Sequence, residues 1–134
     1  MEKPIIRSFV SDIYTSKVYV KEAKTIAASL MLKETKGAGM INQLLLKSDS
    51  TAYTLQIILD KTIVYDKIYA FFATNSEHID NVSAYTAGGK YYLTLQDLAF
   101  QKSFSIRIHP TTSIVFDIVH IRYMIRDEIY ITEG

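Results

Sequence analysis

The sequence predicts an all-β protein, an antiparallel two-sheet β-sandwich with jelly-roll-like connections and an extended N-terminal arm. Apolar and polar residues alternate with a period of two through most of the chain, and helical spacing is scarce. β-Branched and aromatic residues are abundant, including ten tyrosines, as expected of half-buried pleated surfaces. Short polar turns separate the alternating runs, which is typical of a sandwich or a barrel.

Length and composition indicate one ordered domain, residues 1–134, with residues 1–13 as the arm. A chain of 134 residues can bury about two-thirds of its unfolded surface in a single core. The net charge of +1 leaves no excess positive charge for many phosphates, so we expect no nucleic acid as partner. The absence of cysteine excludes disulfides and thiolate metal sites.

The N-terminal segment has no apolar run of signal-peptide length, and no run reaches the ~18 apolar residues of a membrane span. We therefore expect no signal peptide, no transmembrane segment and no membrane partner. The arm carries too much apolar surface for a free tail, so we expect it to cover a sheet edge or groove. It does so on its own domain or, as we favour, on a neighbour in a homo-oligomer. The candidate interface residues are Ile5, Ile6, Phe9 and Val10.

Four alternating runs define expected strands at residues 24–34, 52–60, 90–96 and 104–109. Turn-forming clusters separate the strands at 47–51, 60–61, 86–90 and 109–113. The predicted inward sets are Ile26, Ala28, Leu30 and Leu32; Tyr53, Leu55, Ile57 and Leu59; Tyr91, Leu93 and Leu95; and Phe104, Ile106 and Ile108.

The last long run, residues 113–127, changes face in its middle. Ile114, Phe116 and Ile118 are in phase, and the apolar positions then continue from Val119. Such a slip by one residue predicts a β-bulge, or a crossing between sheets, near Ile118 and Val119. If this run forms a hairpin with residues 104–109, His120 lies opposite residues 102–104.

One stretch, residues 70–84, has no clean period and predicts an ordered loop. Ser76 followed by Glu77 could cap a single helical turn there. The segment Gly37-Ala38-Gly39 begins like a dinucleotide-binding loop, but a strand follows it rather than the helix that phosphate binding requires. We interpret these glycines as permitting a tight bend or a close backbone approach. Gly88-Gly89 is most simply a hairpin turn.

No pattern indicates catalysis, a cofactor or a metal. The three histidines show no ligand spacing, and no G-x-S-x-G elbow or Ser-His-Asp set occurs. Two carboxylates could still converge across the sandwich as in a glycosidase, but we favour roles in solubility and turn capping. The sequence therefore predicts a protein that is not an enzyme. The residues considered are His78, His109 and His120, and Asp49, Asp60, Asp66, Asp80, Asp97 and Asp117.

Tyrosines form the remaining group of interest. Aromatic rings beside polar loops can stack on sugars or anchor a protein interface. We expect most of them to be core or cross-strand residues, and an exposed pair could serve a binding surface. The candidate binding aromatics are Tyr65, Tyr69, Tyr85, Tyr91 and Tyr92.

The order of features from 37 to 126 is a Gly-led strand, a polar turn, AYTLQIILD, a short partner strand, an irregular loop, and the pair YYLTLQDLAFQKSFSIRIH and TSIVFDIVHIRYMIR. It resembles small β-sandwich structural proteins of tailed viruses, of the capsid decoration or tail accessory type. The resemblance implies a virion component, made in the host cytoplasm, that binds other virion proteins and itself. Carbohydrate-binding sandwiches share much of this pattern, so a glycan-binding module is the alternative function, with a glycan as partner.

Overall fold

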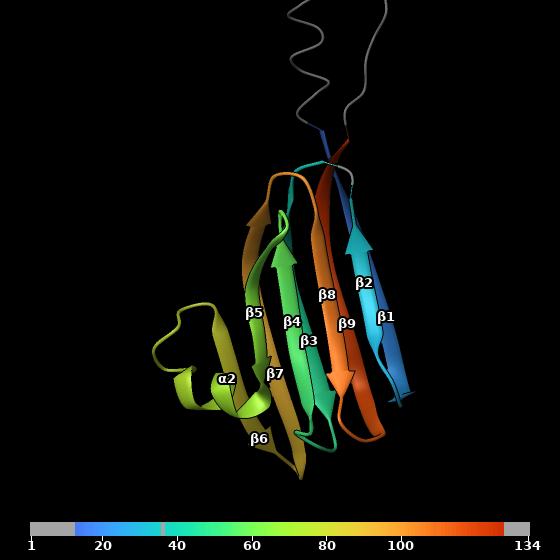
Figure 1. Ribbon diagram of the computed structural model, residues 1–134, viewed down its shortest axis with the longest axis vertical. Coiled ribbons are helices and arrows are strands. Elements are labelled where there is room, and N and C mark those ends of the chain that lie inside the picture. Colours follow the sequence, from blue (N-terminus) through green and yellow to red (C-terminus); the bar gives the residue numbers. More distant parts are fainter. Residues whose placement is uncertain (1–12, 36, 128–134) are drawn as a thin grey trace, which may run out of the picture.

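The computed structural model describes residues 13–35 and 37–127, and it confirms the all-β antiparallel sandwich. Figure 1 shows two sheets packed face to face, with one short helix at one side. In spatial order, the five-stranded sheet contains β1 (Ile13–Ile26), β9 (Ile114–Asp127), β3 (Gly39–Ser48), β7 (Lys90–Phe100) and β6 (Val82–Ala87). The four-stranded sheet contains β2 (Leu30–Glu34), β8 (Phe104–Pro110), β4 (Tyr53–Leu59) and β5 (Thr62–Ile68).

The chain passes between the two sheets at most of its connections. Among the described strands, only β4–β5 and β6–β7 are hairpins within one sheet. Both turn through positive φ angles, at Asp60 and Lys61 in the first and at Gly88 and Gly89 in the second. Both hairpin turns agree with the sequence analysis. The described part of the chain has nine strands, whereas a jelly roll has eight, so jelly-roll-like connectivity stays a prediction.

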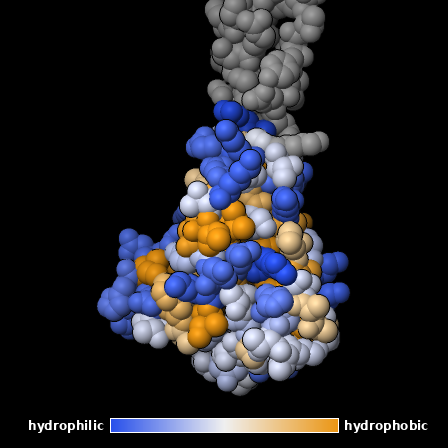
Figure 2. All heavy atoms as spheres, viewed as in Figure 1, coloured by the Kyte–Doolittle hydropathy of each residue, from blue (hydrophilic) through white to orange (hydrophobic). Residues whose placement is uncertain are grey.

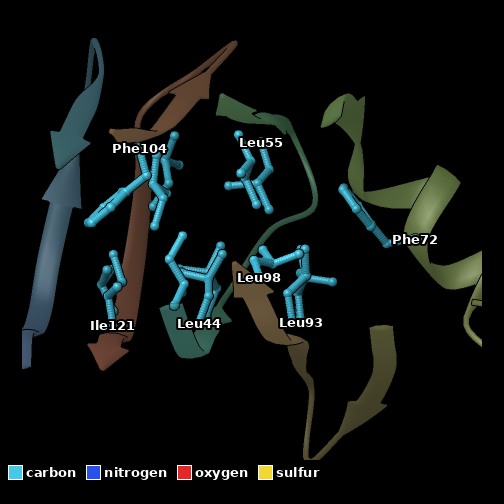
Figure 3. Close-up of a cluster of buried hydrophobic side chains, with 14 of the residues drawn as sticks. Leu44, Leu55, Phe72, Leu93, Leu98, Phe104 and Ile121 are labelled. Carbon is cyan, nitrogen blue, oxygen red and sulfur yellow. The ribbon is translucent and has the colours of Figure 1, made fainter. Parts of the chain in front are cut away.

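The core lies between the sheets and is built from the alternating residues. In Figure 3, Leu55 and Phe104 of the four-stranded sheet face Leu44 and Ile121 of the five-stranded sheet. All four side chains are buried. The predicted inward sets of the strands at 52–60 and 104–109 are confirmed, with Leu59 only partly buried; in β7, Leu93 and Leu95 are buried and Tyr91 is partly buried.

The predicted bulge in the last strand is confirmed. Phe116 pairs with Ser48 and Ile118 pairs with Lys47, so Asp117 has no partner of its own in β3. This extra residue absorbs the change of face, and Phe116 and Val119 are therefore both buried.

The single strand expected at 24–34 is wrong. β1 ends at Ile26, the chain bends through residues 27–29, and β2 begins at Leu30 in the other sheet. Ala28 consequently belongs to neither strand and is exposed. The alternation continued across the bend because both segments turn their apolar side toward the same core.

The expected hairpin between residues 104–109 and the last strand is also wrong. β8 and β9 lie in different sheets, and β9 pairs with β1 and β3 instead. His120 therefore lies opposite Val20 and Leu45, not opposite residues 102–104. A short connection at 111–113 can join two strands of one sheet or two strands of different sheets, so the turn alone does not distinguish a hairpin from a crossing.

The short helix, α2 (Tyr69–Asn75), connects β5 with β6 and covers the side of the sandwich between them (Figure 1). Its Phe72 is fully buried, and Figure 3 shows its ring reaching the core from that side. The cap expected at Ser76 is wrong, since Ser76 ends the helix rather than starting it. No described helix has the length and apolar character to span a bilayer.

Glycine positions agree with the close approach expected at residues 37–39. Gly37 has a φ of +86°, and a Cβ atom on Gly39 would overlap the carbonyl oxygen of Met124. The N-terminal arm lies outside the described residues, except that Ile13 already belongs to β1. The candidate interface residues Ile5, Ile6, Phe9 and Val10 lie outside the described residues as well.

Candidate functional site

The five candidate tyrosines lie on neighbouring elements but on two sides of the five-stranded sheet. Tyr69, Tyr91 and Tyr65 belong to the inner side, around helix α2. Tyr85 and Tyr92 lie on the outer side, opposite each other on β6 and β7. This arrangement agrees with the expectation that most of the five are core or cross-strand residues. Of the five, only Tyr85 is largely exposed, at 51%.

The inner tyrosines hold the helix against the sheet. The hydroxyl of Tyr69 lies 3.2 Å from the carbonyl oxygens of both Tyr85 and Tyr92, to which it donates. Burial raises the pKa of Tyr69, so the hydroxyl keeps its proton as a donor. The ring of Tyr91 lies edge-on to that of Tyr69 at 5.8 Å, and the ring of Tyr65 contacts that of Phe72 at 5.4 Å. These tyrosines pack the fold and leave little ring surface for a ligand.

The outer tyrosines form a stacked pair beside a small charged cluster. The rings of Tyr85 and Tyr92 are parallel within 4°, with centroids 4.7 Å apart. The Lys47 ammonium lies 5.4 Å from the centroid of the Tyr92 ring. Asp117, the bulged residue of β9, accepts a hydrogen bond from Lys90 at 3.2 Å and lies 3.9 Å from Lys47. An aromatic platform next to charged groups suits a polar ligand with an apolar face.

Strand β5 is the most exposed strand of the four-stranded sheet and forms one of its edges. Every β5 side chain is exposed except that of Tyr65, which is partly buried. Three of its apolar side chains are accessible, Ile63 at 57%, Val64 at 42% and Ile68 at 57%. Edge strands of this kind are templates for pairing with another chain.

The outer face of the same sheet carries a groove of about 700 Å³ that runs along β8. Its floor contains Ser103 and Ser105, and the neighbours of Ser105 across the sheet are Lys33 on β2 and Ile58 on β4. A small side chain between two long ones leaves a channel. The other lining residues are Met31, Thr35, Gln56, Lys61, Lys102 and Phe104. Figure 2 shows hydrophobic patches and a hydrophilic band on this face.

A smaller hollow of about 250 Å³ adjoins the groove at Gln56. It brings Asp66 of β5 together with Arg107 and His109 of β8, about forty residues later in the sequence. Asp66 and Arg107 are the cross-strand neighbours of Gln56 on either side. The Arg107 Nε is buried and has no hydrogen-bond partner within the described ranges. In the sequence, Asp66 and His109 stand as separate polar residues, and no pattern marks Arg107 as functional.

Asp60 connects the two loops at one end of the groove through hydrogen bonds. Its carboxylate accepts hydrogen bonds from the backbone N–H groups of Gln101, Lys102 and Ser103, at distances from 2.7 to 3.2 Å. The bond from the Gln101 N–H, then that from Lys102, lowers the pKa of this carboxyl. The β4–β5 turn is thereby tied to the β7–β8 connection, which places Lys61 and Lys102 on the same groove.

The three histidines lie on separate parts of the fold. His78 follows helix α2, His109 lies on β8, and His120 lies on β9 in the other sheet. In residues 13–35 and 37–127, no three His, Asp or Glu side chains come close enough to hold a metal ion. The expectation that the protein needs no metal or cofactor stays a prediction.

Comparisons with known proteins identify no family. No family model matches the sequence, and no curated protein matches it. Among solved structures, the chain is similar to dimeric latent PorU from Porphyromonas gingivalis, with 9% identity and a TM-score of 0.39. That similarity covers 84% of this chain but only 13% of the PorU chain, so this chain spans a small part of that protein's length. A likeness this weak carries no argument about fold or function.

Proposed function

We propose that the protein is a non-enzymatic structural or accessory component of a virion, of the capsid decoration or tail type, and that it acts through protein–protein contacts and self-assembly. The exposed apolar edge strand β5 is the observation that supports this proposal most. Ile63, Val64 and Ile68 present apolar surface on a strand whose outer edge is unpaired within the described sheet. Such an edge gains backbone hydrogen bonds and apolar burial when it meets another chain.

The same strand carries features that limit this pairing to a defined contact. The ladder between β4 and β5 shifts at Ile57/Ile58, so Val64 is an extra residue in β5. Asp66 and Lys67 place charges in the second half of the strand. Bulges and charges of this kind prevent open-ended edge-to-edge aggregation. We therefore expect a closed oligomer rather than fibres.

Light scattering of the purified protein tests the proposal. The Ile63→Lys variant places a charge on the β5 edge and should reduce the measured mass to that of the monomer. The matched control is Met31→Lys on β2, the other edge of the same sheet, where the side chain is 52% exposed. A monomeric wild type, or equal loss of mass in both variants, contradicts assembly through β5. Detection of the protein in purified particles tests the virion role.

The N-terminal arm is expected to contribute to the same assembly. Deletion of residues 1–12 removes the apolar side chains Ile5, Ile6, Phe9 and Val10 without touching β1, which begins at Ile13. If the arm binds a neighbour, the deletion should give folded monomers with an unchanged circular dichroism spectrum. If the mass is unchanged by the deletion, the arm covers its own domain.

The alternative function is a carbohydrate-binding module, which the stacked pair Tyr85 and Tyr92 favours. A sugar ring could lie against the exposed ring of Tyr85, with Lys90 and Asp117 as nearby polar partners. A glycan array run on the wild type and on variants of both surfaces separates the two functions. Saturable binding to one sugar class that Tyr92→Ala weakens and Ile63→Lys leaves unchanged would favour the carbohydrate module.

A further inference from the structure

We infer that the groove along β8, on the outer face of the four-stranded sheet, binds a short anionic glycan whose sugars carry carboxylate groups. This inference goes beyond self-assembly through β5, and it depends on different residues. It also concerns a different surface from the Tyr85–Tyr92 pair, which lies on the outer side of the other sheet.

The size and shape of the groove fit a short chain of sugars. Its volume of about 700 Å³ falls within the range of small-molecule sites. From Ser103 to Arg107 the groove and the adjoining hollow span five residues, the last four of them in β8, or about 13 Å at the usual rise of a strand. That length exceeds one sugar ring and suits an oligosaccharide.

The charges of the groove favour an anion. Three lysines line it, Lys33 on β2, Lys61 in the β4–β5 turn and Lys102 before β8, and no acidic residue does. Lys33 and Lys61 make no ion pair with any described residue. The carboxylate of Asp60 lies near Lys102 but is directed at backbone N–H groups. Arg107 adds a further positive charge in the adjoining hollow, where Asp66 also lies, separated from Arg107 by Gln56 of the intervening strand β4.

The neutral groups of the groove favour a sugar over a peptide. The groove is also lined by the hydroxyls of Thr35, Ser103 and Ser105 and the amide of Gln56. They can exchange hydrogen bonds with sugar hydroxyls, while Ile58 contacts the apolar face of a ring. β8 is paired with β2 on one side and β4 on the other, so an acidic peptide cannot add to it as a strand. A ligand here must be recognised through side chains alone.

Titration calorimetry of the full chain with a short oligogalacturonate tests this inference. The same oligosaccharide with its carboxylates methyl-esterified is the matched ligand, and an oligoglutamate of similar charge is the peptide control. The acidic sugar should bind saturably. Its ester should bind about tenfold more weakly or not at all, as should the peptide.

Three variants then locate the site. The double variant Lys33→Gln/Lys102→Gln should weaken binding by at least about fivefold, since each exposed ionic contact contributes modestly. The control Lys21→Gln/Lys24→Gln removes the same charge from β1 in the other sheet and should leave binding unchanged. Ser105→Leu fills the floor of the groove and should abolish binding while the thermal unfolding midpoint stays close to that of the wild type.

The assembly variant Ile63→Lys should still bind the sugar, which separates this inference from the proposed function. Equal binding of the acid and its ester, equal loss in the two lysine double variants, or tighter binding of oligoglutamate would each overturn the anionic-glycan site. The absence of saturable binding by the wild type would overturn it as well.

Discussion

Gly39 begins β3, the strand between β7 and β9 in the five-stranded sheet. It pairs with Phe100 on one side and Ile125 on the other. A Cβ atom at this position would overlap the Met124 carbonyl oxygen and would lie 2.8 Å from the Cζ atom of Phe100. The neighbours are backbone and a buried ring, so they cannot move away easily.

Gly39→Ala should therefore lower the free energy of unfolding by about 2 to 3 kcal/mol, as overpacking in a core does. Urea unfolding monitored by circular dichroism measures it. Gly88→Ala is the control, because no atom lies within 4 Å of its Cβ and only its φ of +58° opposes a side chain. It should cost about 1 kcal/mol. Equal effects of the two substitutions would show that close approach at Gly39 is not a constraint.

The lowered pKa of the Asp60 carboxyl predicts how the stability of the protein changes in acid. Its pKa is lower in the folded protein than its ordinary value of 3.8, because backbone N–H groups stabilise the charged form. Its contribution to stability is therefore complete above the unfolded pKa and is lost as the pH falls through the lower, folded pKa. Asp60→Asn keeps a residue that tolerates the φ of +52° but removes the charge.

The Asp60→Asn variant should be less stable than the wild type near neutral pH, and the difference should shrink as the pH falls below 3.8. Denaturant unfolding at a series of pH values measures this. Asp97→Asn is the matched control, since Asp97 also has a positive φ of 58°. Within the described residues Asp97 accepts no hydrogen bonds like those of Asp60, so Asp97→Asn should cost less stability near neutral pH than Asp60→Asn. A constant difference between Asp60→Asn and the wild type down to low pH would contradict the assigned hydrogen bonds.

At the scale of single elements, the strands that face the core on one side could be predicted from the sequence. β4, β7 and β8 each bury alternate residues, and their period of two is visible in the letters. β5 is exposed on both faces, and β1 has only Ile26 fully buried among its described side chains. The sequence pattern does not reveal β1 and indicates β5 only as a short partner strand. Alternation of apolar and polar residues arises when one face of a strand is buried, and neither strand buries much of either face.

Neither helix α2 nor the distribution of the strands between the two sheets could be predicted from the sequence, and the two reasons differ. The helix has seven residues, and Ile68 at its start gives no side-chain cap, so no capping signal marks it. The pairing of β9 with β1 and β3 depends on contacts between residues far apart in the sequence. The groove could not be predicted for the same reason, since its walls come from β2, the β4–β5 hairpin and the β7–β8 connection, which are far apart in the sequence.

The Tyr69 hydroxyl connects helix α2 to the β6–β7 hairpin. Removing this hydroxyl tests whether the contact stabilises the two elements. Tyr69→Phe removes the donor to the carbonyl oxygens of Tyr85 and Tyr92 and should lower the free energy of unfolding by about 1 kcal/mol. Tyr85→Phe removes a hydroxyl that makes no hydrogen bond within the described ranges and should change stability by less than about 0.5 kcal/mol. Equal effects in thermal unfolding would show that the Tyr69 hydroxyl does not hold the hairpin.

On the scale of the whole molecule, the sandwich has two sheet faces and four sheet edges, and these differ in chemistry. β5 offers an apolar edge with a bulge, the four-stranded sheet offers a cationic groove, and the five-stranded sheet offers a stacked tyrosine pair. The groove is not lined by Ile63, Val64 or Ile68, so separate variants can test assembly and ligand binding. The central claim is that the β5 edge is the contact through which copies of the chain assemble.

Amide hydrogen exchange of β5 tests this claim most directly. In a pairing edge strand, the outward N–H groups of residues 62–68 gain hydrogen-bond partners from another chain. The wild type at a concentration where it is oligomeric should therefore exchange these amides more slowly than the Ile63→Lys variant at the same concentration, with little change in β4. Equal exchange rates in β5, or slower exchange confined to β1 or β6, would contradict assembly through this edge.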